Sequence, residues 1–289
     1  MIRFGAPLLF VLIWSTGFVV ARVAAPHADL QLFLVLRFAL TAAVMGLMAM
    51  VAGAKWPRGR ELWPHALAGA LMQGVYISAS YWAIAHGLAV GVMALLGALQ
   101  PLFTALFLVA RKQTKLALRA VGGLLIGFGG VGLVLTPALT SHGVGSFTGL
   151  TVGAALLSVI AVTAGTLIQK WLATSDLRSA ASVQNLSGAA ISALVMWGVG
   201  TGRWDGTPIL WSALLWAVLV LSVIGTTLLM WMMRHGEATK VTALILLVPP
   251  LAAIQAFFFF GEALAPLQIV GFALALGGVM LTRSAPLRT

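Results

Sequence analysis

The seventeen residues from His86 to Leu102 read HGLAVGVMALLGALQPL, and a related stretch from His235 to Leu251 reads HGEATKVTALILLVPPL. At a constant offset of 149 residues, eight of the 17 positions are identical, whereas chance in sequence this apolar gives about two. The repeat therefore predicts an internally duplicated chain. We expect residues 1–140 to form the first repeat and residues 141–289 the second, within one integrated membrane domain.

The chain around this repeat is too apolar for a water-soluble protein. Of its 289 residues, 61% are hydrophobic and 8% charged, and the mean hydropathy is +1.06; soluble domains carry about 25% charged residues. About 20 apolar residues cross a bilayer as a helix, and continuously apolar runs favour helices over barrel strands. Ten such spans are predicted, near residues 5–24, 31–53, 63–85, 88–110, 117–136, 147–169, 179–199, 209–232, 239–260 and 265–282.

The two repeats are expected to cross the membrane in opposite directions. The matched stretches open the fourth and ninth predicted helices, and helices an odd number apart in the chain run in opposite directions. The expected fold is an all-α polytopic membrane protein with ten transmembrane helices arranged as two inverted five-helix repeats. Inverted repeats are typical of transporters that bind substrate near the bilayer midplane between the halves.

Basic residues predict the orientation. With a cytoplasmic N-terminus, 14 of the 17 Lys and Arg residues fall on the inner side, as the positive-inside rule requires. Only Arg22 and Arg203 fall outside, and Arg37 lies within a span. The net charge of +11 thus orients a multi-pass membrane protein, with lipid neighbours and both termini cytoplasmic, and does not indicate a nucleic-acid partner. The inner residues are Arg3, Lys55, Arg58, Arg60, Arg111, Lys112, Lys115, Arg119, Lys170, Arg178, Arg234, Lys240, Arg283 and Arg288.

Six short motifs lie along the chain: Trp14-Ser-Thr-Gly17-Phe18, Leu36-Arg37-Phe38, Gln100-Pro101-Leu102-Phe103, Val248-Pro249-Pro250-Leu251, Phe260-Gly261-Glu262, and Gly271-Phe272 with Gly277-Gly278-Val279. With these motifs the chain resembles the drug/metabolite transporter superfamily in its EamA-type ten-helix form, and within it the YddG-type exporters of aromatic and other amino acids. This resemblance implies amino-acid export by alternating access at a bacterial inner membrane, with a cavity bounded by the first, third, fourth, sixth, eighth and ninth helices.

Charged residues inside the hydrocarbon mark functional sites in membrane proteins. All six carboxylates fall in predicted loops or at span ends, so we expect a facilitator without obligatory proton or sodium coupling. Arg37 lies about 10 Å inside its span. Its guanidinium could clamp a substrate carboxylate through two parallel donors, or it could snorkel outward or tie helices together.

Three prolines occupy matching places in the two halves and are expected to kink their helices. Pro101 lies in the fourth span, and Pro249 with Pro250 in the ninth. Each proline frees a carbonyl from the helical ladder, and interrupted helices at corresponding positions indicate a transporter site. The freed carbonyls would suit a substrate ammonium; kinks that only shape packing are the alternative.

Polar residues within the apolar spans complete the candidate substrate site. Gln73, Tyr76 and Ser80 follow one helical face, and Trp14 with Tyr76 could form an aromatic wall. The alternative role is interhelical hydrogen bonding, worth about 0.6 kcal/mol for each bond. The candidate substrate-binding residues are Trp14, Arg37, Gln73, Tyr76, Ser80, Gln100, Thr163 (with Thr166 beside it), Ser222 and Thr226.

Other functions are less well supported by the sequence. Export of a drug-like cation or a purine is the alternative within the transporter class. An integral-membrane lipid enzyme would need an acid, base, metal ligand or nucleophile near a membrane face, and only scattered histidines are present. The chain has no cysteine, which excludes thiolate chemistry and disulfides. We expect no enzyme activity, no cofactor and no metal, and a monomer or weak homo-oligomer.

The inverted topology can be tested with single cysteines, because the chain has none of its own. A cysteine at position 86 is expected to react with an impermeant thiol reagent added outside intact cells, and one at position 235 only after the membrane is opened. Labelling of position 235 from outside would contradict the inverted arrangement.

Overall fold

A computed structural model describes residues 2–111, 117–140, 148–170, 172, 176–234 and 245–283. Every named element among them is a helix. The extended pairing in these residues is an isolated bridge between Ala28 and Trp204. Residues 235–244, the first part of the His235–Leu251 stretch, lie outside the described residues.

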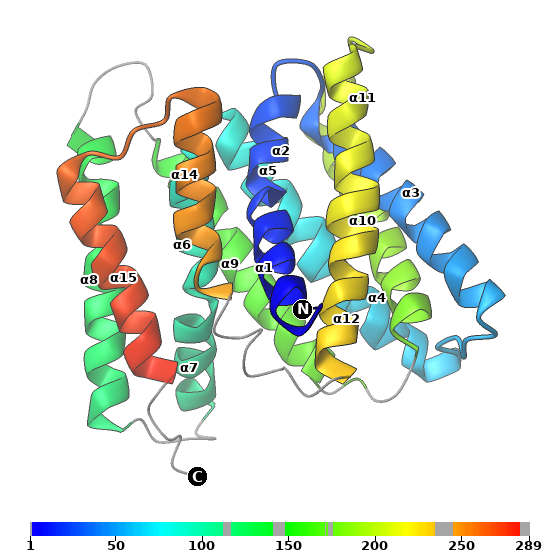
Figure 1. Ribbon diagram of the computed structural model, residues 1–289, viewed down its shortest axis with the longest axis horizontal. Coiled ribbons are helices and arrows are strands. Elements are labelled where there is room, and N and C mark those ends of the chain that lie inside the picture. Colours follow the sequence, from blue (N-terminus) through cyan, green and yellow to red (C-terminus); the bar gives the residue numbers. More distant parts are fainter. Residues whose placement is uncertain are drawn as a thin grey trace.

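Several helices of the first half are interrupted within the bundle (Figure 1). The first is broken at Thr16, the third contains a π-helical segment, η2, and the fourth is broken at Leu99. The elements are α1 (Ile2–Ser15), α2 (Gly17–Ala24), α3 (Leu30–Val51), η1 (Gly59–Glu61), α4 (Leu62–Gly69), η2 (Ala70–Val75), α5 (Tyr76–Ala85), α6 (Val90–Ala98), α7 (Gln100–Ala110) and α8 (Leu118–Thr140).

The second half has corresponding elements at the offset of the sequence repeat. Shifting α3 by 149 residues gives 179–200, close to α10, and shifting η2 gives 219–224, which lie inside a second π-helical segment, η3. The elements are α9 (Gly149–Lys170), α10 (Leu177–Val199), α11 (Pro208–Leu215), η3 (Trp216–Ile224), α12 (Gly225–Arg234), α14 (Val248–Phe260) and α15 (Pro266–Arg283).

Six described helices are long and apolar enough to cross a membrane by length and composition. The count of ten stays a prediction. The expected spans 63–85 and 179–199 are helical but are not among the six; α10 buries Ser179, Gln184 and Asn185, which lower its hydropathy. Helices Val248–Phe260 and Pro266–Thr282 are apolar but shorter. The six are Ala6–Ala24, Leu30–Val51, Val90–Ala110, Leu118–Thr136, Gly149–Lys170 and Pro208–Leu229.

The outer surface of the bundle is apolar, as expected for contact with lipid. Trp197 is 87% exposed, Phe258 78% and Leu125 71%. Soluble monomers rarely expose large contiguous apolar patches, whereas in a bilayer these side chains face acyl chains. The surface therefore agrees with the composition in indicating a membrane protein.

Helices α8 and α15 pack closely along one flank of the bundle (Figure 1). A Cβ on Gly278 would overlap the backbone nitrogen of Gly127, and one on Gly271 would lie 2.6 Å from the carbonyl oxygen of Gly130. Glycine lets helix backbones approach in membranes, where apolar side chains gain nothing by leaving lipid. Since residues near 127 meet those near 278, and 130 meets 271, the two helices are antiparallel.

Helices α3 and α10 form a second antiparallel pair, held by polar contacts. The Ser182 hydroxyl donates to the Ala42 carbonyl at 2.8 Å, and the Ser179 hydroxyl donates to the Lys55 carbonyl at 2.7 Å. At the other end, Asp29 caps α3 and accepts from the backbone of the segment that follows α10. Both pairs thus join a helix to its counterpart 149 residues away.

The loops at one end of the bundle are fastened to one another. Asp29 accepts backbone N–H groups of Gln31 at 2.8 Å, Gly202 at 3.0 Å and Thr201. Partial burial acts to raise the pKa of Asp29, but these backbone donors outweigh it and the pKa is lowered. The Asp29 carboxylate therefore stabilises the join between the start of α3 and the end of α10.

Glu262 makes a second connection at this end. It pairs with Arg22 at 3.4 Å and accepts the backbone N–H of Val90 at 2.9 Å. Here burial dominates these contacts, and the pKa of Glu262 is raised. The loop after α14 is thereby tied to the ends of α2 and α6.

Substitutions at neighbouring glycines test the packing of α8 on α15. Gly278→Ala is expected to lower the unfolding free energy by about 1–3 kcal/mol, because the methyl group would force two backbones apart. Gly277→Ala is the control, since no atom lies within 4 Å of a Cβ at that position. Thermal unfolding in detergent compares them, and equal effects at the two positions would contradict the close approach.

Asp29→Asn tests the role of the carboxylate charge while keeping a side chain that can cap a helix. Because the folded-state pKa of Asp29 is lowered, the stabilisation by its charge is present above the ordinary aspartate pKa and is lost as the pH falls through the folded value. We expect Asp29→Asn to unfold at a lower temperature than the wild type near pH 7, with the gap closing in acid. Glu262→Gln is a comparison with the opposite pH dependence. Because the pKa of Glu262 is raised in the folded protein, the wild type should become more stable relative to Glu262→Gln as the pH falls. A gap for Asp29→Asn that is independent of pH would contradict the assignment.

Candidate functional site

A cavity of about 330 Å³ lies among the interrupted helices. Both halves of the chain contribute to it. The contributing elements are α1, α2, α3, η2, α5, α6 and α7 from the first half, and α9, α10, η3, α12 and α14 from the second. Its lining residues are Trp14, Gly17, Phe18, Arg37, Met72, Gln73, Tyr76, Ile77, Tyr81, Ala94, Gly97, Ala98, Gln100, Val162, Thr166, Asn185, Leu221, Ser222, Thr226, Ile245, Val248 and Pro249.

Irregular backbone surrounds this central cavity. The break at Thr16 precedes the lining residue Gly17, the break at Leu99 precedes Gln100, and both π segments contribute lining residues. In η3 the Ser222 hydroxyl donates to the Ala217 carbonyl five residues earlier, at 2.9 Å. Non-helical backbone at membrane depth is tolerated where it lines a cavity, and π turns are frequent at functional sites.

Arg37 brings a buried positive charge to the cavity wall. It is 8% exposed, and its Nη1 donates to the Tyr81 hydroxyl at 2.9 Å. Its guanidinium carbon lies 5.5 Å from the centre of the Phe38 ring and 6.0 Å from that of Tyr81. The Nε is fully buried with no hydrogen-bond partner, and no carboxylate among the described residues pairs with this guanidinium. Arg37 thus has donors to offer a ligand.

Carbonyl groups supply the opposite polarity in the cavity. Pro101, Pro249 and Pro250 have no N–H, so the carbonyls of Gly97, Ile245 and Leu246, four residues earlier, lose their α-helical partners. Gly97 and Ile245 line the central cavity. These acceptors come from corresponding interruptions in the two halves.

Aromatic side chains form part of the wall. The rings of Phe18 and Tyr76 meet edge to face with centres 6.3 Å apart. The Tyr76 hydroxyl lies 3.6 Å from the position of a Cβ on Gly97, and the Trp14 ring lies 3.5 Å from one on Gly225. The site therefore combines apolar aromatic surface with a few polar groups, as small-molecule sites commonly do.

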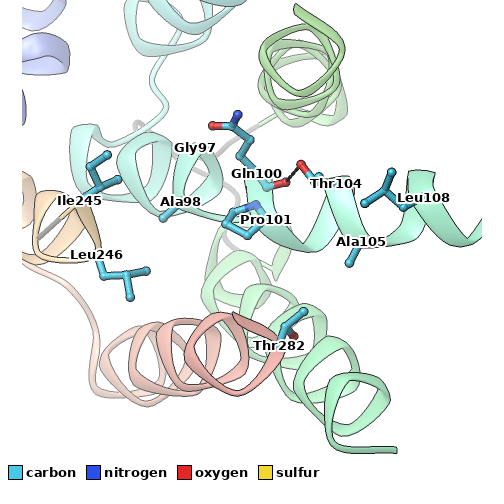
Figure 2. Close-up of a pocket in the computed structure, with 10 residues that line it drawn as sticks. All are labelled: Gly97, Ala98, Gln100, Pro101, Thr104, Ala105, Leu108, Ile245, Leu246 and Thr282. Atoms are coloured by element: carbon cyan, nitrogen blue, oxygen red, sulfur yellow. Dashed lines mark hydrogen bonds between the residues drawn. The ribbon is translucent and has the colours of Figure 1, made fainter. Parts of the chain in front are cut away.

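A second cavity of about 580 Å³ adjoins the first along α7 (Figure 2). Both are lined by Gly97, Ala98, Gln100 and Ile245. The Gln100 amide extends away from Thr282 in Figure 2, and its Nε2 donates to the Thr166 hydroxyl at 2.8 Å. Gln100 and Thr166 therefore bridge α7 and α9 beside the junction of the two cavities.

Most residues predicted for the substrate site lie together in the structure. Ser80 and Thr163 do not line either cavity: both are buried, and their hydroxyls donate to the Tyr76 and Val159 carbonyls, each at 2.7 Å. Pro250 lines neither cavity. Those that line the central cavity are Trp14, Arg37, Gln73, Tyr76, Gln100, Ser222, Thr226 and Pro249, while Pro101 lines the second.

Ser80 lies on the same regular helix, α5, as the lining residues Tyr76, Ile77 and Tyr81. Its short side chain is turned back onto the Tyr76 carbonyl, whereas the longer Tyr81 side chain reaches the cavity. Sequence reasoning also missed Asn185, which lines the central cavity. Its signal was a buried amide in an apolar span; it is 6% exposed and its Nδ2 donates to the Ala181 carbonyl at 2.8 Å.

The acidic residues that the structure describes lie outside the long helices. Asp29 and Asp176 cap the starts of α3 and α10, Glu61 ends η1, and Asp205 and Glu262 lie in loops. Glu237 lies outside the described residues. The described cavity walls therefore carry a cation and no carboxylate.

Apolar helices long enough to cross a bilayer indicate a multi-pass membrane protein, and the cavity among their interruptions is the size of a small-molecule site. A family model for EamA-like transporters matches residues 4–136 and 149–284. The chain belongs to the EamA-like transporter family.

Two similar proteins extend the comparison. A probable terminal-alkyne amino-acid exporter from Streptantibioticus cattleyicolor is 24% identical over 291 residues, which cover 96% of this chain and 91% of that protein. A protein solved by crystallography is similar with a TM-score of 0.65 and 20% identity, over 96% of this chain and 94% of its own. The structural likeness supports the fold.

Proposed function

We propose that this transporter exports amino acids from the cytoplasm by alternating access, as a facilitator, from the inner membrane of a bacterium. The substrate is a zwitterion whose carboxylate contacts Arg37 and whose side chain lies against Trp14, Phe18 and Tyr76. Transport follows the substrate's own concentration gradient.

The observation that carries this proposal is the buried, incompletely paired guanidinium of Arg37. A charge removed from water is costly unless it is paired, and the described cavity wall offers it a hydroxyl and aromatic faces only. A carboxylate from the substrate would supply the missing partner through two parallel hydrogen bonds. A drug-like cation would instead add a like charge, so the site disfavours that alternative.

The ammonium of the zwitterion has acceptors available at the helix breaks. The carbonyls of Gly97 and Ile245 lack α-helical partners and line the same cavity. The cavity volume of about 330 Å³ lies at the small end of the range of about 300–1,000 Å³ for small-molecule sites. The name of the Streptantibioticus relative, an amino-acid exporter, points to the same substrate class.

Alternating access is supported by the pairing of corresponding helices. Helices α3 and α10, and likewise α8 and α15, are 149 residues apart and pack antiparallel, as two inverted five-helix repeats would require. The two matches to the family model divide the chain at nearly the same place as the proposed repeats, 1–140 and 141–289. In such a fold the halves rock about a site at the midplane, which is where we propose that Arg37 binds substrate.

Counterflow of labelled leucine and phenylalanine into proteoliposomes tests the function. We expect saturable exchange, and we expect Arg37→Lys to reduce the rate per folded molecule about tenfold or more, because lysine keeps the charge but loses the planar fork. Arg60→Lys, an exposed basic residue in η1, is the matched control and should transport normally.

Two results would count against the proposal. Unchanged transport per folded molecule in either Arg37→Lys or Arg37→Ala would reject the carboxylate clamp. Imposed gradients of pH, sodium or potential should not drive leucine above equilibrium, since a zwitterion moving alone carries no net charge. Accumulation driven by any of these gradients would show a coupled carrier.

A further inference from the structure

We infer that Tyr81 is a positioning residue for substrate recognition: its hydroxyl holds Arg37 so that the unpaired edge of the guanidinium is presented to the carboxylate of an amino acid. The inference rests on the proposed function and assigns a role to a residue that contacts Arg37.

The Tyr81 hydroxyl has its single proton committed. It donates to the Gly17 carbonyl at 2.9 Å, just beyond the break in the first helix. A phenolic oxygen has one proton and accepts through its lone pairs, so the bond to Arg37 must run from the Arg37 Nη1 to the Tyr81 oxygen. The two hydrogen bonds therefore form a chain in which Arg37 donates to Tyr81 and Tyr81 donates to the Gly17 carbonyl. This chain joins α3, α5 and α2.

This chain also determines which donors of Arg37 stay available. With Nη1 on Tyr81, the remaining edge carries Nε and Nη2, the two donors that can hold a carboxylate in parallel. The Nε is buried and has no partner, and no hydrogen bond joins Nη2 to a described residue. Arg37 lines the central cavity, and its Nη2, unlike Nε, is not among the fully buried atoms. A ligand in the cavity therefore contacts Nη2 first and gains the Nε bond only when the wall gives way beside it.

The neighbours of Tyr81 make it a rigid support. The residue is fully buried, and its ring stacks on Phe33 with centres 6.5 Å apart. A phenylalanine at this position keeps the ring, its packing and its contact with Arg37, and removes only the hydroxyl. Tyr81→Phe therefore separates positioning from packing.

Three ligands of similar shape can report on the carboxylate contact. Leucine carries both charged groups, 3-methylbutylamine lacks the carboxylate, and 4-methylpentanoate lacks the ammonium. Binding to detergent-purified protein is measured by ligand-induced shifts in unfolding temperature and by displacement of labelled leucine.

We expect Tyr81→Phe to weaken leucine and 4-methylpentanoate about tenfold to a hundredfold, the range for a hydrogen bond to a charged group, and to leave 3-methylbutylamine unchanged. In an Arg37→Lys background, Tyr81→Phe should change leucine binding by no more than about twofold, because the two residues act as one unit. Ser158→Ala is the control: it removes another fully buried hydroxyl, which donates to the Ala155 carbonyl at 2.6 Å, and should change none of the three ligands.

The outcomes separate this inference from the proposed function. Equal weakening of leucine and 3-methylbutylamine by Tyr81→Phe would show a structural role, and unchanged binding of both would show no role; either overturns the inference while leaving the exporter intact. Additive effects of Tyr81→Phe and Arg37→Lys would overturn it as well. Failure of the wild type to bind both leucine and 4-methylpentanoate would overturn the amino-acid substrate and the carboxylate site together.

Discussion

A bilayer offers no water to backbone groups or charges, so each polar group at membrane depth must find a partner within the protein or face a cavity. This constraint accounts for where the helices of this chain are interrupted. The break at Thr16, the break at Leu99, the prolines after Ile245 and the two π segments all adjoin the central cavity. The regular helices α8 and α15 lie along one flank (Figure 1). Irregular backbone is thus concentrated around the cavity that also receives the guanidinium of Arg37.

Two kinds of helix contact hold this arrangement. Glycines on α8 and α15 bring backbones together without polar bonds, whereas serines on α10 reach carbonyls in and just after α3. Loops at one end add charged contacts through Asp29 and Glu262. The interior of the bundle, in contrast, contains a cation without a matching acid. The flanks and one end therefore carry the polar and close-backbone contacts, while the interior packs a large apolar cluster around a cavity that holds this cation.

The sequence predicted the transporter class and most of the polar residues that line the cavity, because both depend on simple patterns. Apolar run length indicated membrane helices, and Arg37 and the prolines were conspicuous as polar or kinking residues in apolar spans. Positions that depend on the reach of a side chain were harder. Ser80 was expected to line the site, but its short side chain donates to the Tyr76 carbonyl, and the longer Tyr81 side chain reaches the cavity instead. Asn185 was overlooked because its place on the cavity wall depends on the packing of α10 against other helices, which its neighbours in sequence do not indicate. The hydrogen bonds among Arg37, Tyr81 and Gly17 join residues up to 64 positions apart, and a single sequence carries no record of them.

The pairing of each flank helix with its own counterpart has a consequence for how such a molecule could be assembled. A contact between two equivalent elements running in opposite directions is self-complementary, as at the interface of a twofold dimer. Two separate copies of one half could make the α3–α10 and the α8–α15 contacts, provided that one copy entered the membrane upside down relative to the other. A free half would need to insert in both orientations in equal amounts, which strongly biased loop charges prevent. Joining the halves in one polypeptide removes that requirement. Each half can then carry the basic residues that set its own orientation, and every molecule contains one half in each orientation.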